Sequence, residues 1–535
     1  MKKFIKIFLI LFIVTQLLPS CKKTFLDEQV QSSYAPETLT DSLGLEASIA
    51  GLQNRVTNWF SYSDNQGWLA VWQVGTDIAY TVPGRAGGFE NPYGAYATLT
   101  STDGAVGFAW RWAYEVINNA NGIIGAVENP SLGGISQASK NSFNAEARFF
   151  RAYAYNILAT CFGKVPIIKE SLKAPKTDFV RATVDEVNSL LVEDLTFAST
   201  NLPAIEGVKS NSKGKMYARA NKTMAQQLLA EVYLRMGKND LAEAQCTEII
   251  NNPAFSLVTA RYGTRLNIPG DAFSDMFRYG NQRRVQGNKE ALWVIEFENP
   301  STVVGGVTNS PQQRRIWGAA YHEVAGMKLA DSLGGRTNAR LRLSNWLLYN
   351  LYDANDMRNS QNNIRRRFWY NLPGDPKNGQ QVPFVGTDTL FRLAPHTTKW
   401  YQFDPADEFG FAMIKDIIVM RLGETYLLRA EAQFKQNKKV EAAASINAVR
   451  ARANAAPITD LQVTLDFILD ERVRELVAEE NRRMTLMRTG TLVTRATTLN
   501  GDKITGLTAK NLLLPIPQAE INLNIGAPLG QNDGY

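Results

Sequence analysis

Histidine and cysteine are scarce in this sequence, which limits the chemistry that the chain can perform. There are 2 histidines and 3 cysteines among 535 residues. His322 and His396 have no partner at the spacing of a metal site, and the zinc-protease helix motif that His322-Glu323 could begin fails because position 326 is glycine. We therefore expect no metal and no cofactor. Cys161 and Cys246 lie in apolar helical contexts, and their spacing leaves both a pair of buried thiols and a disulfide open.

The chain also lacks a block of positive charge. Its formal net charge is +7, and removal of an N-terminal segment that carries three lysines (Lys2, Lys3 and Lys6) and no acid leaves +4. The arginine run at 365–367 is short and adjoins the aromatic residues 368–370. Nucleic acid is therefore not an expected partner. Neither a glycine-rich phosphate loop after a strand nor a nucleophile elbow occurs.

The first 21 residues indicate the compartment. After the three lysines, residues 7–14 are continuously apolar, Leu17 and Leu18 extend this character, and Pro19-Ser20-Cys21 follows. This order of charge and apolar residues is typical of a secretory signal peptide, here 1–20. The apolar stretch is shorter than the roughly 20 residues that a transmembrane helix needs.

Cys21 adds a second signal to this leader. A small residue followed by cysteine after a leucine-rich core resembles the lipobox of bacterial lipoproteins, in which the cysteine becomes the N-terminus and carries acyl chains such as palmitate. We expect Cys21 to be the site of lipid attachment, and residues 21–44 to form the anchor and a polar tether. Several acyl chains anchor a protein almost permanently, at about 0.8 kcal/mol per buried methylene. The alternative is an ordinary signal peptide with an incidental cysteine.

Four segments have the periodicity of amphipathic helices. In the second, Ala230, Gly237 and Ala242 follow the spacing of tetratricopeptide repeats, and Ala430 and Ala442 repeat the two alanines in the third. A repeat pair cannot bury its apolar face alone, so further helices must stack on it. The four segments are 144–162, 222–251 with a break at 237–240, 422–453 with a break at 436–438, and 465–487. The helices expected to stack on the repeat pairs are 144–162, 45–59 and 106–127.

Two long regions between the helical blocks, 61–103 and 254–414, are rich in glycine, asparagine, proline and aromatic residues. We expect short strands at 292–297 and 400–403. Long irregular connections on a rigid scaffold are usually functional, and aromatic rings there can stack on the apolar face of a sugar or on a peptide. The residues that we predict to bind ligand are Tyr80, Arg85, Tyr93, Tyr96 and Trp317.

Five motifs in the same order resemble those of the SusD/RagB family of outer-membrane lipoproteins. They are the helix 145–155 with its exit turn 161–166, the repeat 421–432, the segment 446–452 that follows it, the helix 470–476 with 480–483, and the closing signature 513–524 with 530–535. Together with the lipobox they extend over the whole chain.

The resemblance implies a mostly α fold, in which tetratricopeptide-like helix pairs form an α-superhelical scaffold with long loop-rich insertions and a few short strands. It also implies a protein anchored at the cell surface in the outer membrane, which captures an oligosaccharide and delivers it to a SusC-like TonB-dependent transporter. Peptide capture, as in the RagB branch, is the alternative, because ligand identity does not transfer between the variable loops. One SusD-like domain, 45–535, is then expected, with scaffold at 45–60, 104–253 and 415–490, ligand-facing loops at 61–103 and 254–414, and the signature at 491–535.

An enzyme and a purely structural protein are the competing hypotheses. A glycosidase needs two carboxyl groups on opposite sides of a bond. The acidic cluster of the fourth helix instead alternates with arginines at the spacing of ion pairs, so we predict no catalytic residue. Its members are Glu471, Glu475, Glu479 and Glu480, with Arg472, Arg474, Arg482 and Arg483. A lid or assembly platform for the transporter, with little ligand affinity, is the third hypothesis.

Overall fold

The described part of the chain begins just before the first scaffold helix. The computed structural model describes residues 41–61, 68–172, 174–208, 219–300, 302–304, 311–386, 388–410 and 413–535. The expected signal peptide, Cys21 and most of the tether lie outside these residues. Within the described ranges, no helix has both the length and the apolar character needed to cross a membrane.

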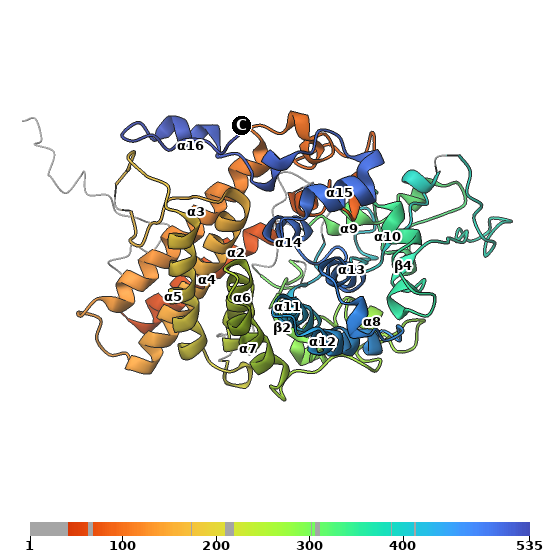
Figure 1. Ribbon diagram of the computed structural model, residues 1–535. Coiled ribbons are helices and arrows are strands. Elements are labelled where there is room, and N and C mark those ends of the chain that lie inside the picture. Colours follow the sequence, from red (N-terminus) through yellow and green to blue (C-terminus); the bar gives the residue numbers. More distant parts are fainter. Residues whose placement is uncertain are drawn as a thin grey trace, which may run out of the picture.

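Long helices pack on one another in chain order; those before residue 251 lie at the left of Figure 1, and those after residue 421 lie to their right, beside the loops. These are α2 (Ser42–Ser61), α3 (Gly104–Glu128), α4 (Gln137–Phe162), α5 (Val184–Asn201), α6 (Lys222–Arg235), α7 (Asn239–Ile250), α11 (Leu422–Lys435), α12 (Lys439–Arg452) and α13 (Leu465–Leu476). The contacts run from α2 through α7 to α11, which also packs against α12 and α13. This confirms the mostly α, tetratricopeptide-like fold expected from the sequence.

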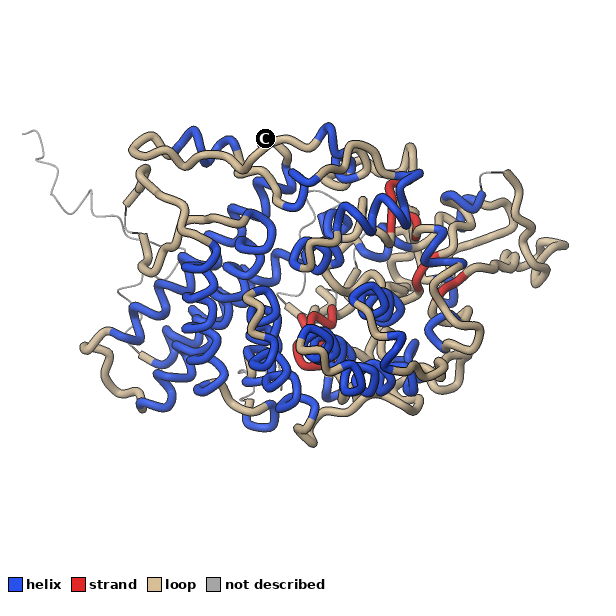
Figure 2. The backbone as a smooth tube through the Cα atoms, viewed as in Figure 1, coloured by secondary structure: helices blue, strands red, loops and turns tan. Residues whose placement is uncertain are grey.

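Loops with little regular structure predominate on the side away from α2–α7, which we call the loop side (Figure 2). They are held together by three antiparallel two-stranded sheets, β1–β3, β2–β6 and β4–β5. The strands are β1 (Ala79–Thr81), β2 (Ala291–Ile295), β3 (Leu341–Leu343), β4 (Ile364–Arg365), β5 (His396–Thr397) and β6 (Ile417–Arg421). The strand expected at 292–297 is confirmed, whereas 400–403 is a loop that follows β5.

Short helices complete the loop side and the C-terminal part. They are α8 (Ala272–Asp275), α9 (Gln313–Trp317), α10 (Asn345–Tyr349), α14 (Arg482–Arg488), α15 (Leu492–Asn500) and α16 (Gln518–Leu523). The last segment returns to the N-terminal helices, where Leu514 donates its backbone N–H to the carbonyl of Cys161 at 2.7 Å and Gln518 donates to that of Ser101 at 2.8 Å. The C-terminal segment is therefore joined through backbone hydrogen bonds to the end of α4 and to the loop before α3.

The two helix pairs of the predicted repeats are built alike. The four alanines of the pattern, Ala230, Ala242, Ala430 and Ala442, are fully buried. Between α6 and α7 the turn residue Gly237 has a φ of 72°, and between α11 and α12 Asn437 has a φ of 62°. Glycine adopts this left-handed conformation freely and asparagine tolerates it, so two different residues serve the same turn.

The predicted helix 465–487 is interrupted, and the prediction of one continuous helix was wrong. It ends with α13 and resumes as α14, and Ala478 in the break has a left-handed φ of 63°. No glycine or proline marks this position, so local propensity does not predict it. Tertiary contacts hold the turn, because Trp400 donates its indole N–H to the carbonyl of Ala478 at 3.1 Å and the side chain of Asn481 caps α14.

Candidate ligand-binding site

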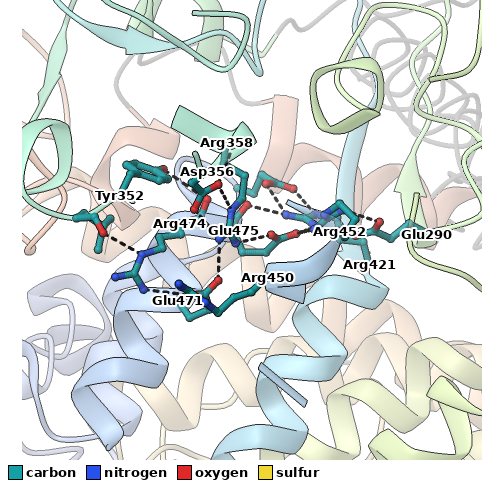
Figure 3. Close-up of polar contacts among 12 residues, drawn as sticks. Glu290, Tyr352, Asp356, Arg358, Arg421, Arg450, Arg452, Glu471, Arg474 and Glu475 are labelled. Atoms are coloured by element: carbon teal, nitrogen blue, oxygen red, sulfur yellow. Dashed lines mark hydrogen bonds and ion pairs between the residues drawn. The ribbon is translucent and has the colours of Figure 1, made fainter. Parts of the chain in front are cut away.

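A network of buried ion pairs fastens the loops to the scaffold (Figure 3). Glu475 of α13 accepts hydrogen bonds from Arg421, Arg452 and, at 3.0 Å, from Arg358 in the loop region. Glu290, next to β2, accepts from Arg421 at 2.8 Å and from Arg452 at 2.9 Å. Burial by itself raises the pKa of Glu475, but the three guanidinium groups outweigh burial and hold that pKa below its usual range.

The other carboxylates of the predicted acidic cluster are held in the same way. Glu471 pairs with Arg450 at 2.8 Å and Arg474 at 2.9 Å, while Glu480 accepts a hydrogen bond from Arg472 at 2.8 Å. Both carboxylates are buried. The predicted ion pairs are confirmed, and they lie inside the protein, where these groups stabilise the fold.

Tyr93 and Tyr96, two of the predicted ligand-binding residues, pack together in the core. Their rings meet edge to face, and the guanidinium of Arg483 lies 4.5 Å from the ring centroid of Tyr93. Arg483 donates to the hydroxyl oxygen of Tyr96 at 2.7 Å, and that hydroxyl donates to the carbonyl of Gly75 at 2.6 Å. Both tyrosines are fully buried, and these contacts account for their positions in the core. Their role in ligand binding stays a prediction.

Tyr80 and Arg85 lie on and just after β1. Tyr80 pairs with Arg342 across the β1–β3 sheet and is buried. The guanidinium of Arg85 is partly exposed, donates to a carboxylate oxygen of Glu323 at 2.7 Å and lies 4.4 Å from the ring centroid of Phe391. Arg85 is therefore the most accessible of the predicted residues, although its charge is already paired.

Trp317 lines a small cavity between the helices and the loops. The indole is buried, and the aromatic residues around the cavity are Trp59, Phe60, Trp72, Tyr153, Trp317 and Trp400. The cavity volume is about 140 Å³. Sites for small molecules usually have volumes of roughly 300 to 1,000 Å³. This space suits ordered water better than a sugar ring.

A larger cavity opens within the loop side, and we call it the loop cavity. It is formed by residues of the segments 265–279, 330–332, 362–365 and 398–401, and its volume is about 540 Å³. The aromatic residues that line it are Phe277, Tyr279 and Tyr401, and the charged ones are Arg265, Arg278, Asp331 and Arg365. The side chain of Tyr279 is 39% exposed, so its ring can receive a ligand.

A chain of hydrogen bonds orients the polar wall of the loop cavity. Arg365 donates from Nε to the hydroxyl oxygen of Tyr401 at 2.8 Å, and this hydroxyl lies 2.7 Å from Nε2 of His396. Burial lowers the pKa of His396 to about 3, so its imidazole is neutral. Nδ1 of His396 then donates to the carbonyl of Ala394 at 2.8 Å, and Nε2 accepts from Tyr401. This relay fixes the orientation of both side chains before a ligand arrives.

A third hollow lies on the helical side, between α3 and α16, with a volume of about 360 Å³. Apolar groups dominate its wall, among them Trp110, Tyr114, Phe179 and Leu529. Recognition of a sugar needs several hydrogen-bonding groups beside an aromatic ring, and the loop cavity provides more of them.

Residues of the loop cavity lie in stretches of sequence that indicate other features. Arg365 is the first residue of the run at 365–367, a pattern that by itself indicates only a short nucleic-acid footprint. Tyr401 belongs to 400–403, where we expected a strand. Tyr279 and Arg278 follow α8 in a region without periodicity. The cavity is assembled from four separate segments, and their meeting in space cannot be read from their spacing.

Two family models together match most of the chain. One, described as the SusD family, matches residues 289–535, and the other, described as starch-binding associating with outer membrane, matches residues 25–234. A SusD-like protein of Bacteroides ovatus is 29% identical over 312 residues, which cover 55% of this chain and 51% of that relative. The starch-binding protein SusD of Bacteroides thetaiotaomicron is 26% identical over 458 residues, which cover 75% of this chain and 74% of that protein.

A solved structure has the same fold. Surface glycan-binding protein A from Bacteroides thetaiotaomicron, in complex with laminarihexaose, matches with a TM-score of 0.71 and covers 92% of this chain and 100% of its own. The sequence identity is 17%, so this likeness shows the fold alone.

Proposed function

The chain belongs to the SusD/RagB family, and on that premise we propose that it is a binding protein that captures a glycan in the loop cavity. Two of its relatives are named for starch binding and for a complex with laminarihexaose, which supports a carbohydrate ligand. Peptide capture is the second candidate, because rings and guanidinium groups also suit a peptide.

The observation that carries the proposal is the lining of the loop cavity. Its volume of about 540 Å³ is that of a small-molecule site. The exposed ring of Tyr279 can stack on the apolar face of a sugar. Arg265, Asn362 and Arg365 provide hydrogen bonds for hydroxyl groups. The combination of an exposed ring with several donors favours recognition of a polyhydroxylated ligand.

We further propose that the protein binds without turnover. The carboxylates Glu471, Glu475 and Glu480 are buried in ion pairs with arginines. A general acid must reach the leaving group of its substrate, and a buried, paired carboxylate does not. Incubation of the purified protein with the glycan that it binds should leave the chain length of that glycan unchanged, and the appearance of shorter products would support the hydrolase hypothesis.

Delivery to a SusC-like TonB-dependent transporter and anchorage in the outer membrane through Cys21 complete the proposal. They rest on the family and on the lipobox-like sequence before Cys21. Replacement of Cys21 by alanine should move the protein from the membrane fraction to the soluble fraction, and unchanged membrane association would contradict the anchor. Co-purification with the transporter tests the partnership. A protein that joins the transporter but binds none of the glycans or peptides offered would support the lid hypothesis.

The site is tested by two matched tyrosine substitutions. A panel of oligosaccharides and peptides first identifies a ligand for the full chain, and calorimetry measures its affinity. Tyr279→Ala removes an exposed ring of the loop cavity and should weaken binding at least tenfold, or about 1.4 kcal/mol. Tyr349→Ala removes a ring that is 59% exposed at the end of α10, outside the cavity, and should leave the affinity unchanged. Equal effects of both changes would place the site elsewhere.

The residues predicted from the sequence form a separate arm of this experiment. Arg85→Ala removes the accessible member of that set, while Trp317→Phe makes a small change at the cavity of about 140 Å³ that Trp317 lines. If binding is lost with Arg85→Ala and kept with Tyr279→Ala, the ligand lies beside β1 and not in the loop cavity.

A further inference from the structure

Positively charged side chains outnumber negatively charged ones in the lining of the loop cavity. Three are arginines, Arg265, Arg278 and Arg365, and one is an aspartate, Asp331. Arg265 forms an ion pair with Asp331, and both side chains are partly exposed. Arg278 shares the buried carboxylate of Asp275, at 3.0 Å, with Arg261, at 2.9 Å. The carboxylate of Asp275 thus pairs with two guanidinium groups beside the cavity.

Arg365 is the arginine without an acidic partner. Its Nε donates to the hydroxyl oxygen of Tyr401 at 2.8 Å and its Nη2 donates to the carbonyl of Ser332 at 2.9 Å. Within the described ranges it forms no ion pair, and its Nη1 has no hydrogen-bond partner. The guanidinium is therefore held from one side by neutral oxygens, and its remaining donors can meet a ligand.

A buried lysine lies behind the wall. Lys415 donates from Nζ to the carbonyl of Phe277 and, at 3.2 Å, to the carbonyl of Tyr401, which are both residues of the cavity wall. Burial, together with the nearby Arg278, lowers the pKa of Lys415 to about 7. The neighbouring Asp416 is engaged by Arg283 at 2.7 Å. Among the charged groups in and beside the wall, guanidinium groups therefore outnumber carboxylates.

We propose that the glycan captured in the loop cavity carries an anionic group, a carboxylate or a sulfate ester, and that Arg365 binds this group. The inference rests on the proposed function and adds the chemical class of the ligand. A guanidinium binds a carboxylate or a sulfate through parallel hydrogen bonds, which are stronger than those to a neutral hydroxyl. The partly exposed ring of Tyr279 is then free to stack on the sugar that bears the anion.

The test compares pairs of glycans that differ only in charge. Oligogalacturonate is compared with its methyl ester, and an oligosaccharide of sulfated carrageenan is compared with its desulfated form. We expect at least one charged member to bind the full chain tenfold or more tightly than its neutral counterpart. Because the attraction is electrostatic, the difference should shrink when NaCl is raised from 50 to 500 mM. The two pairs distinguish a carboxylate from a sulfate.

Three substitutions assign the effect to the cavity. Arg365→Gln should weaken binding of the charged glycan at least tenfold and change binding of its neutral counterpart much less, and Arg365→Lys should restore part of the affinity. Asp331→Asn removes the lining carboxylate and should strengthen binding of the charged glycan. Arg367→Gln is the matched control, because Arg367 carries the same charge two residues further on, is exposed and does not line the cavity.

The outcomes separate this inference from the proposed function. Equal affinity for charged and neutral glycans, or tighter binding of the neutral ones, overturns the anionic ligand and leaves glycan capture standing. Equal loss with Arg365→Gln and Arg367→Gln overturns the role of Arg365. A chain that binds peptides but no glycan of either charge overturns the proposed function and this inference with it.

Discussion

Asp77 and Arg482 lie 405 positions apart in the sequence and form a bidentate ion pair in the core. Nε of Arg482 donates to Oδ1 of Asp77 at 2.9 Å, and Nη2 donates to Oδ2 at 2.6 Å. Arg495 of α15 donates to the same carboxylate at 2.8 Å. The first loop-rich region is thereby fixed to two C-terminal helices through one buried side chain.

Asp77→Asn should destabilise the protein by about 3 kcal/mol, because it removes the buried anion that Arg482 and Arg495 share and leaves them only Glu480, or Asp466 and Asp470, as partners. Urea unfolding of the purified protein at neutral pH measures the loss. Asp466→Asn is the control, since Asp466 also pairs with Arg495, at 2.8 Å, but has a side chain that is 75% exposed. Exposed pairs contribute about 0 to 1 kcal/mol. Similar losses in the two variants would show that burial of Asp77 does not determine its contribution.

The turn residues Gly237 and Asn437 lead to a second prediction, which concerns a smaller change in the free energy of unfolding. A Cβ at Gly237 would meet no atom within 4 Å, so substitution there has a conformational cost only. Gly237→Ala should lower the free energy of unfolding by about 1 kcal/mol, because alanine is strained at this positive φ. Gly237→Asn should lower it less, as Asn437 occupies the equivalent turn with a φ of 62°. A larger loss with asparagine than with alanine, measured by urea unfolding, would contradict this equivalence.

Features that depend on local spacing could be predicted from the sequence. The buried alanines of the repeats, the turn residues Gly237 and Asn437, and the end of α4 before Gly163 follow from small residues and left-handed positions in consecutive segments. The family resemblance rests on the same local motifs. α4 begins at Gln137, before the expected start at 144, because Ser136 caps the helix and accepts a hydrogen bond from the backbone N–H of Ser139.

Features that depend on distant partners could not be predicted. The break at Ala478 is stabilised by Trp400, which no helical pattern includes. Tyr93 and Tyr96 lie in a loop-rich region, and only the arrival of Arg483 from α14 shows why they are buried. The same holds for Arg365, whose position in the loop cavity is set by the pairing of β4 with β5, whereas the nearby Arg367 faces solvent.

The cysteines give a third prediction. Cys161 and Cys246 are both free and fully buried, and burial raises the pKa of Cys161 to about 12 and that of Cys246 further still. A thiol reacts as its thiolate, so neither should react with a disulfide reagent in the folded protein at pH 8. In a Cys21→Ala background, two thiols per chain should react once urea unfolds the protein. Reaction of fewer than two in urea without reductant would indicate a disulfide.

The titration of His396, beside the loop cavity, should make the stability of the protein depend on pH. Its pKa is lowered to about 3 in the folded protein, whereas an unfolded histidine titrates near 6.5. Between these two values the unfolded chain binds a proton that the folded chain does not, so stability is lost as the pH falls from about 6.5 toward 3. The contribution of this group between pH 7.5 and pH 4.5 is about 3 kcal/mol.

His396→Gln removes this titration and keeps a hydrogen-bonding side chain beside Tyr401, so its stability should fall less steeply with acid than that of the native sequence. Urea unfolding at intervals from pH 7.5 to pH 4.5 gives both curves, and their difference isolates the histidine from the carboxylates that both proteins share. His322→Gln is the control, because His322 is less buried and its pKa is lowered by burial to a smaller extent. Parallel curves for His396→Gln and the native sequence would mean that the pKa of His396 is the same in the folded and the unfolded protein, so that its imidazole is protonated at pH 4.5. Tyr401 could then not donate to Nε2 of His396. The hydrogen bond between His396 and the hydroxyl of Tyr401, which positions the partner of Arg365, would have to run from His396 to Tyr401 instead.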